Sequence, residues 1–182
     1  MRVIAHRTVR LTLHDRRVVE VRPLEPEDRE ALAAAVRRLS DETRYLRFAT
    51  TKPQLSEREL DFLLDVNHHS REALVAVDPV TRRGVAVVRY VEVPNEADRV
   101  EIAATVADDW QGQGLGGALL TQLIERARNE GYVAVRASVL AANRRSIEML
   151  LRAGFKRRSG YGILREYELT LDDALGADAV FE

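Results

Sequence analysis

The sequence contains no cysteine among its 182 residues. This excludes a disulfide framework, cysteine-ligated zinc, iron–sulfur clusters and a thiol nucleophile. No stretch approaches the roughly 20 consecutive apolar residues that a membrane-spanning helix needs. The start of the chain, Met1 to Arg7, is interrupted by charge too early for a signal peptide. We therefore expect a cytoplasmic protein with no membrane partner.

Neither sign of charge is in excess, because 28 Lys and Arg residues face 29 Asp and Glu residues. A dedicated nucleic-acid-binding protein normally shows a basic excess, so we expect no nucleic-acid partner. We also expect no metal, since the adjacent pair His68-His69 cannot place both rings on one ion in a regular element. The length predicts a single domain over residues 1–182, with its core at about 18–171 and a C-terminal tail at 172–182.

The apolar pattern predicts a mixed α+β domain. We expect helices from Glu25 to about Leu39, from Ser56 onward with a capping box to Glu59, after the loop that ends at Gly116, and over residues 143–152. Residues 39–53 are expected to be irregular. Strands are expected at residues 8–13, 18–24, 73–77, 85–93, 100–106, 132–140, 155–158 and 164–171. This order predicts one mostly antiparallel central sheet flanked by about four helices.

A glycine-rich loop, Gln111-Gly112-Gln113-Gly114-Leu115-Gly116-Gly117, lies between an expected strand and an expected helix. Glycine lets the backbone turn sharply and approach a ligand closely. Free N–H groups at a helix start, together with the helix dipole, form a site for anions. The loop therefore predicts phosphate binding. The alternative is a tight turn that binds nothing.

Two common phosphate-binding motifs do not fit this loop. The spacing Gly112-x-Gly114-x-x-Gly117 matches the dinucleotide fingerprint, which needs an acidic residue about 20 positions later for the ribose. No Asp or Glu occurs between Glu130 and Glu148, so a dinucleotide site is disfavoured. A P-loop is excluded because no Gly-Lys-Ser or Gly-Lys-Thr follows.

The stretch from Val106 to Gly116 resembles motif A of the GNAT acetyltransferases, whose core is Gln/Arg-x-x-Gly-x-Gly/Ala. Gln111, Gly114 and Gly116 match that core.

Two other segments carry the same resemblance. Asn143 followed by Ala153-Gly154-Phe155 at the end of a helix is similar to a second GNAT signature. Residues 39–48 resemble the GNAT domains of bacterial Pat-type protein lysine acetyltransferases.

The resemblance implies a GNAT-like fold that binds acetyl-CoA as co-substrate and transfers its acetyl group directly to a primary amine, with protein lysine as the favoured acceptor. Main-chain N–H groups from Gln113 to Gly117 would hold the pyrophosphate. The strand that ends at Val106 would diverge from the next parallel strand, so that pantetheine lies between them. Asp108 and Asp109 would have to point away from the anion. The implied cofactor-binding residues are Val106, Gln111, Gly112, Gln113, Gly114, Leu115, Gly116, Gly117 and Asn143.

Amine acetylation needs a base to accept a proton and donors to face the oxyanion. Our candidate catalytic base is Glu101, which shares a strand face with the small residues Ala103 and Thr105. The alternative is a solvated carboxylate on an exposed strand. By analogy with the family, the N–H group of Val106 would face the oxyanion.

Many GNAT enzymes carry a tyrosine where this sequence has Leu150, so a proton for the thiolate would come from Tyr161, Tyr167 or solvent. A small-molecule amine or a protein N-terminus remains an alternative acceptor, and a homodimer is possible. A third alternative is a non-catalytic acyl-CoA-binding regulatory module, since the usual tyrosine is missing.

Overall fold

The computed structural model describes residues 8–48, 52 and 54–171. The predicted tail at 172–182 and the start at 1–7 lie outside these residues. The strands are β1 (Val9–Thr12), β2 (Val18–Pro23), β3 (Arg71–Val77), β4 (Gly84–Val93), β5 (Glu96–Val106), β6 (Ala134–Leu140), β7 (Lys156–Ser159) and β8 (Leu164–Thr170). The helices are α1 (Arg29–Arg38), α2 (Asp41–Phe48), α3 (Glu57–Leu64), α4 (Leu115–Asn129) and α5 (Arg144–Arg152), with short 3-10 turns at Pro26–Asp28 and Asp108–Trp110.

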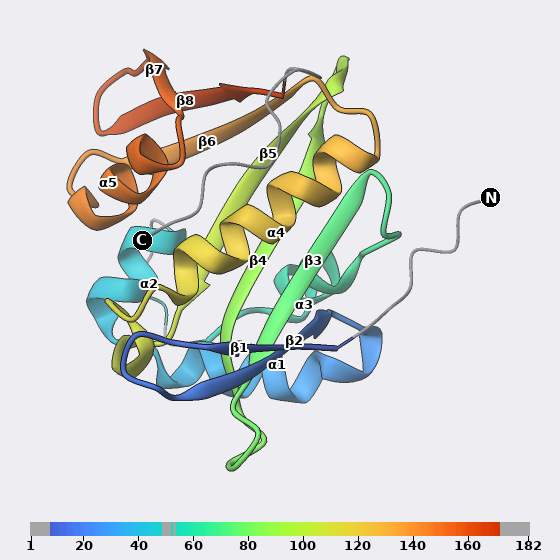
Figure 1. Cartoon of the computed structure of the whole chain (residues 1–182), viewed down its shortest axis with the longest axis vertical. Coiled ribbons are helices and arrows are strands. Elements are labelled where there is room, and N and C mark those ends of the chain that lie inside the picture. The colour runs from blue at the N-terminus through green and yellow to red at the C-terminus, as the bar shows by residue number, and fades with distance from the viewer. Residues whose placement is uncertain (1–7, 49–51, 53, 172–182) are drawn as a thin grey trace.

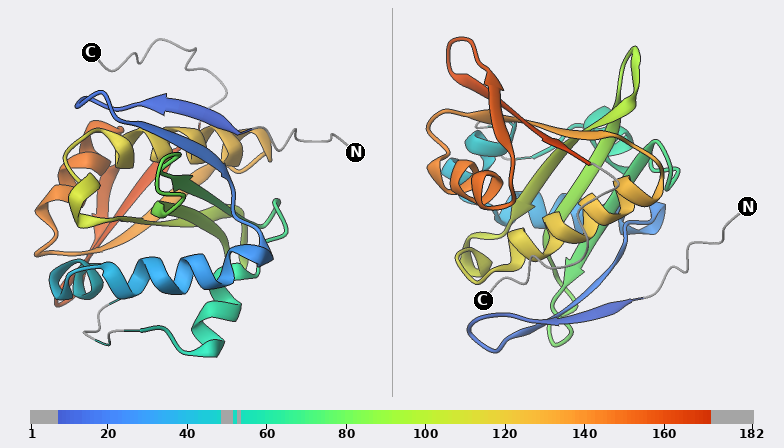
Figure 2. Two further views of the ribbon diagram at one scale, coloured as in Figure 1. Left: turned by 90° about the horizontal axis from the view of Figure 1, so that it is seen from below. Right: turned by 45° about the horizontal axis from the view of Figure 1, so that its top comes forward.

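All eight strands belong to one sheet, in the order β1-β2-β3-β4-β5-β6-β8-β7. Every neighbouring pair is antiparallel except β5 and β6, which run parallel. Helix α4 crosses one face, while α1, α2 and α3 lie on the other (Figures 1 and 2). The result is a three-layer arrangement in which the parallel pair lies in the interior of the sheet.

The core divides into two clusters, one on each face of the sheet. The larger cluster includes Leu119, Leu120 and Leu123 of α4, each no more than 1% exposed, packed against Val88 and Val100. Their spacing of three and four residues places them on one stripe of the helix. The smaller cluster joins α1 and α3 to β3. Helix α4 is thereby fixed on the sheet, and its first turn is held beside the end of β5.

Most elements lie where the sequence predicts them. The capping box of α3 is present, with the hydroxyl of Ser56 accepting from the N–H of Glu59. Gly131 follows α4 with a φ of +88°, as a C′ glycine should. Strand β5 is longer than expected and begins at Glu96, so the turn before it is confined to Pro94 and Asn95.

The prediction that residues 39–53 are irregular is wrong for residues 41–48, which form α2. The described part of the chain therefore contains five α-helices, where about four were expected. The hydroxyl of Ser40 accepts a hydrogen bond from the N–H of Thr43, and Asp41 and Glu42 lie in the positive first turn. A serine followed by two acidic residues is a typical helix start, but the many charged residues of the segment favoured an irregular prediction.

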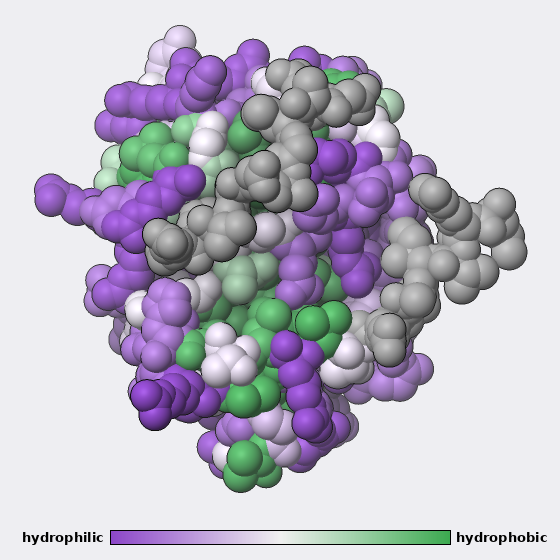
Figure 3. Space-filling model, in the orientation of Figure 1, coloured by the Kyte–Doolittle hydropathy of each residue, from purple (hydrophilic) through white to green (hydrophobic). Residues whose placement is uncertain are grey.

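No helix in the described ranges is long and apolar enough to cross a membrane. The face shown in Figure 3 is mostly hydrophilic, with smaller hydrophobic areas between.

An ion pair ties α4 to β3 near the end of the helix remote from the loop. Glu72 is 1% exposed and accepts hydrogen bonds from Nη1 of Arg126, at 2.6 Å, and from the N–H of Ala73, at 2.8 Å. Nδ1 of His68 lies 2.9 Å from Oε1, the same oxygen that accepts from Ala73, while Arg126 donates to Oε2. A buried carboxylate without its partner is strongly destabilising.

We expect Arg126→Met to lower the free energy of unfolding by about 2–4 kcal/mol, because Glu72 would stay buried without its cation. Chemical denaturation measures the change. Arg152→Met is the matched control, since Arg152 is 77% exposed and lies 3.9 Å from Glu148. Equal denaturation midpoints for the two variants would contradict this account.

Candidate active site

The parallel strands β5 and β6 separate partway along their length. They pair from Arg99 with Ala134 to Ile102 with Ala137, and no further. Beyond that point β5 continues to Val106 and β6 to Leu140, while each keeps its antiparallel neighbour on the other side. The predicted divergence is therefore present, and it opens toward the first turn of α4.

Main-chain groups of β5 face this opening. The N–H of Ala107 donates to the carbonyl oxygen of Val85 in β4, at 2.8 Å. Because main-chain groups alternate in direction along a strand, those of Ala104 and Val106 point toward β6. No β6 partner pairs with this part of β5. An extended ligand with amide groups could hydrogen-bond here as an additional strand does.

The glycine loop presents a row of free amides at the start of α4. None of the main-chain N–H groups from Gln113 to Gly117 donates a hydrogen bond to any described residue. The first amide that does is that of Ala118, which donates to the carbonyl of Gly114 at 3.0 Å. Free amides at the positive end of a helix dipole bind anions. The residues present thus fit a diphosphate group.

Gly114 is required by its backbone and by its neighbour. It has a φ of +84°, and a Cβ there would lie 2.8 Å from Nε2 of His14. His14 belongs to the turn between β1 and β2, and its N–H donates to the carbonyl of Gln113 at 3.3 Å. The same turn places Nη2 of Arg17 2.9 Å from the carbonyl of Asp109, with its guanidinium 4.0 Å from the Trp110 ring centroid. The β1–β2 turn therefore covers and braces the loop.

Gln111 has a structural part in the site. Its side-chain nitrogen donates to the carbonyl oxygen of Val106 at 3.1 Å and to the hydroxyl of Thr43 at 3.2 Å. Its side-chain oxygen accepts from Arg145 of α5. Gln111 thus joins three elements and satisfies the Val106 carbonyl, while the N–H of that residue still faces the opening.

Asp108 points away from the loop amides, as the prediction of an anion site requires. Its carboxylate accepts hydrogen bonds from the N–H and hydroxyl of Ser40, at 2.9 and 2.6 Å, and from the hydroxyl of Thr43, at 2.6 Å. Burial alone would raise the pKa of Asp108, but these hydrogen bonds outweigh it and lower the pKa. The negative charge is therefore fixed on the α2 side.

Helix α5 closes the other side of the loop. Asn143 caps it, with Oδ1 accepting from the N–H of Ser146 at 3.1 Å. A Cβ at Gly116 would lie 3.2 Å from the sulfur of Met149, so the two helices meet closely at that glycine. Leu150 is 2% exposed in the core. No proton donor therefore occupies the position where many GNAT enzymes have tyrosine.

Glu101 lies on the sheet face opposite α4, with Ala103 and Thr105, as predicted. Its side chain is exposed. It lines a polar cavity of about 440 Å³ over β5, β6 and β8. Tyr167 also lines this cavity, whereas Tyr161 is 92% exposed on the β7–β8 turn. The other residues that line it are Val93, Arg136, Ala137, Ser138, Arg158, Ser159 and Glu166.

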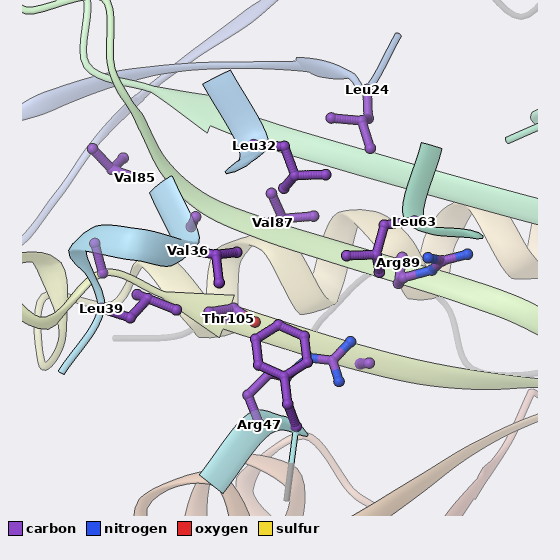
Figure 4. A pocket seen from close by; sticks show the side chains of 14 residues that line it. Leu24, Leu32, Val36, Leu39, Arg47, Leu63, Val85, Val87, Arg89 and Thr105 are labelled. Carbon is purple, nitrogen blue, oxygen red and sulfur yellow. The ribbon is translucent and has the colours of Figure 1, made fainter. Parts of the chain in front are cut away.

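A second, apolar cavity of about 50 Å³ lies on the same face beneath α1 and α2 (Figure 4). Its floor includes Ala103 and Thr105 of β5, in the strand segment whose edge is free, and Ala107, which follows the strand. Two arginines, Arg47 of α2 and Arg89 of β4, line it among aliphatic side chains. Strand β5 thus lines both cavities, the polar one with Glu101 and the apolar one with Ala103 and Thr105.

An open mixed sheet, with one parallel pair that diverges beside a glycine-rich helix start, is the fold of the GNAT acetyltransferases. The family model "Acetyltransferase (GNAT) domain" matches residues 19–156. The chain therefore belongs to the GNAT acetyltransferase family.

Three relatives illustrate the likeness. Acetyltransferase PA5475 of Pseudomonas aeruginosa is 36% identical, over 79% of this chain and 78% of the relative. Acetyltransferase Pat of Mycolicibacterium smegmatis is 30% identical over 74% of this chain, but that match spans only 40% of Pat. The crystal structure of the GNAT domain of S. lividans PAT superposes with a TM-score of 0.86 at 29% identity, over 93% of this chain and all of that domain.

The structure brings the predicted loop residues, Val106 and Asn143 to one end of α4, with Glu101 further along β5. Sequence reasoning missed His14, Arg17 and Arg47. His14 lies about 100 positions before the loop in the chain, and only the β1–β2 pairing carries it there. Arg47 lies in the segment that the sequence predicts to be irregular, where no side-chain direction could be inferred.

We expect Gly114→Ala to abolish measurable CoA binding, because the new Cβ would displace His14 and strain a residue at positive φ. Isothermal titration calorimetry with CoA measures it. Gly131→Ala is the matched control: it has a φ of +88° but no atom within 4 Å of the added Cβ. Both variants should lose comparable stability, and only Gly114→Ala should lose the ligand. Normal CoA affinity in Gly114→Ala would refute this assignment of the loop.

Proposed function

We propose that this protein transfers the acetyl group of acetyl-CoA to a primary amine. The observation that carries the proposal is the row of unpaired main-chain amides from Gln113 to Gly117 beside the diverging strands. Acetyl-CoA supplies an acyl group on a thiol, which is a good leaving group. The chain's amides supply the pyrophosphate site, and the free edge of β5 supplies partners for the amides of pantetheine.

Glu101 is the proposed catalytic base. It lies five residues before Val106 on β5, and its carboxylate borders a cavity open to solvent. A carboxylate there can accept the proton of an ammonium group directly or through water. The N–H of Val106 points into the opening and is the proposed donor to the oxyanion.

The polar cavity beside Glu101 supports a proposal for the acceptor. The polar cavity of about 440 Å³ has room for a long, flexible amine such as a lysine side chain. The similarity to the two Pat proteins supports the prediction of protein lysine as acceptor. A small-molecule amine is the alternative, and the apolar cavity with its two arginines bears on that choice.

We expect Glu101→Gln to lower kcat for amine acetylation about 100- to 10,000-fold, the contribution typical of a general base. CoA affinity should be unchanged, because Glu101 is not among the loop amides. Thiol release from acetyl-CoA measures turnover, and calorimetry measures binding. The acceptors are lysine peptides, protein N-terminal peptides and small amines, with acetylated products identified by mass spectrometry.

Glu148→Gln is the control, since this exposed residue of α5 lies outside both cavities. An unchanged rate in Glu101→Gln would refute the base assignment. CoA binding with no release of the CoA thiol from acetyl-CoA, whichever acceptor is added, would refute the transferase and favour a non-catalytic acyl-CoA-binding module.

A further inference from the structure

Arg89 is a buried cation with unused hydrogen-bonding capacity. It is 4% exposed in the middle of β4. Its Nη1 donates to the carbonyl oxygen of Phe62 at 3.2 Å, and its guanidinium lies 4.8 Å from the centroid of the Phe62 ring. Its Nε and Nη2 have no hydrogen-bond partner among the described residues. Buried guanidinium groups are normally paired, because an uncompensated charge is costly.

A second cation faces the same cavity. Arg47 of α2 is half-buried and has no ion pair with any acid in the described ranges. Burial and, to a smaller extent, the charge of Arg89 lower the pKa of Arg47 to about 10, while the charge of Glu101 opposes the shift. The two guanidinium groups thus destabilise each other in surroundings that are otherwise aliphatic (Figure 4).

The cavity they line has the size of a small functional group. Its volume of about 50 Å³ has room for about three or four heavy atoms, since one water needs about 10–15 Å³ on this measure. The remaining walls are aliphatic or aromatic, apart from the hydroxyl of Thr105. A carboxylate fits both the volume and the fork of donors that a guanidinium presents.

Arg89, one of the two arginines that line the apolar cavity, lies close to Glu101, the proposed base. Arg89 pairs across the strands with Ala103, and Glu101 is two residues before Ala103 on the same face. Diagonal neighbours of this kind are about 7–8 Å apart. One small molecule can therefore place an amine near Glu101 and a carboxylate near Arg89.

We propose that the acceptor bears a carboxylate close to its reacting amine, as a free amino acid does, and that Arg89 and Arg47 bind this carboxylate in the apolar cavity. The inference rests on the proposed function and narrows its acceptor. It favours the small-molecule alternative over an isolated protein lysine.

The test compares α-amino acids with amines that differ only in lacking the carboxylate. L-methionine is paired with 3-(methylthio)propylamine, L-leucine with isoamylamine and L-phenylalanine with phenethylamine. We expect kcat/KM to be about 10- to 100-fold higher for the preferred amino acid than for its partner, because hydrogen bonds to charged groups are strong. Arg89→Met should remove this preference and leave CoA affinity intact.

Stability separates a binding role from a structural one. If Arg89 binds a ligand, Arg89→Met should keep or raise the melting temperature without ligand, since it removes an unpaired buried charge. It should also lose the rise in melting temperature that the preferred amino acid gives the wild type. Arg37→Met, at an exposed position of α1 away from the cavity, should behave as wild type in both measurements.

Several results would overturn the proposal. One is an equal kcat/KM for an amino acid and its matched amine, and another is a preference for the amino acid that survives Arg89→Met. A third is a lysine peptide that reacts faster than every amino acid, whether or not the peptide carries an acidic residue next to its lysine. If CoA binds but no acceptor is acetylated, the proposed transfer fails. The melting-temperature comparison then still tests the carboxylate site, and an equal effect of amino acids on wild type and Arg89→Met would overturn it.

Discussion

The unpaired amides at the start of α4 are the constraint around which the rest of the site is arranged. A helix always leaves its first N–H groups without intrahelical partners. Most proteins satisfy them with a capping side chain, but here the N-cap is Gly114, which has no side chain to offer. The free energy of leaving these donors unpaired is tolerable only where water or an anion reaches them. This explains why the loop lies at the open end of the diverging strands.

Keeping those amides available requires that the protein's own acids stay away from them. Two aspartates directly precede the loop, and an ion pair or cap formed by either would close the site. Ser40 and Thr43 of α2 hold the carboxylate of Asp108 on the far side. Arg17 takes the main-chain carbonyl of Asp109. The β1–β2 turn and α2 thus keep the loop amides accessible by holding Asp108 and Asp109 in place, rather than by donating hydrogen bonds to an anion.

The succession of strands along the chain and the glycine loop could be predicted from the sequence because both depend on local residue patterns. Alternation marks the strands, and the glycines of the loop together with the leucine stripe after Gly116 mark the helix start. Glu101 could be placed on the face of Ala103 by the period of a strand alone. The neighbours of the loop could not be predicted, because His14 and Gln113 are about 100 residues apart and meet only through tertiary pairing. Helix α2 was missed because four of its eight residues are charged, and charge density is a poor guide where a cap and one buried arginine decide the fold.

The cofactor side and the acceptor side both leave hydrogen-bond donors unpaired, but at different depths in the protein. On the cofactor side the chain leaves neutral donors unpaired at the surface, where water can serve them at little cost. On the acceptor side it leaves Nε and Nη2 of Arg89 unpaired inside the protein, where water is scarce and the cost is larger. The aromatic face of Phe62 recovers part of it. An aliphatic residue would pack among these leucines and valines with less strain, so a stable fold alone does not require a cation at position 89. A carboxylate that enters the cavity would supply the hydrogen bonds and the opposite charge that the buried guanidinium of Arg89 lacks. The affinity for a carboxylate is therefore higher than at an exposed arginine, whose donors already bond to water.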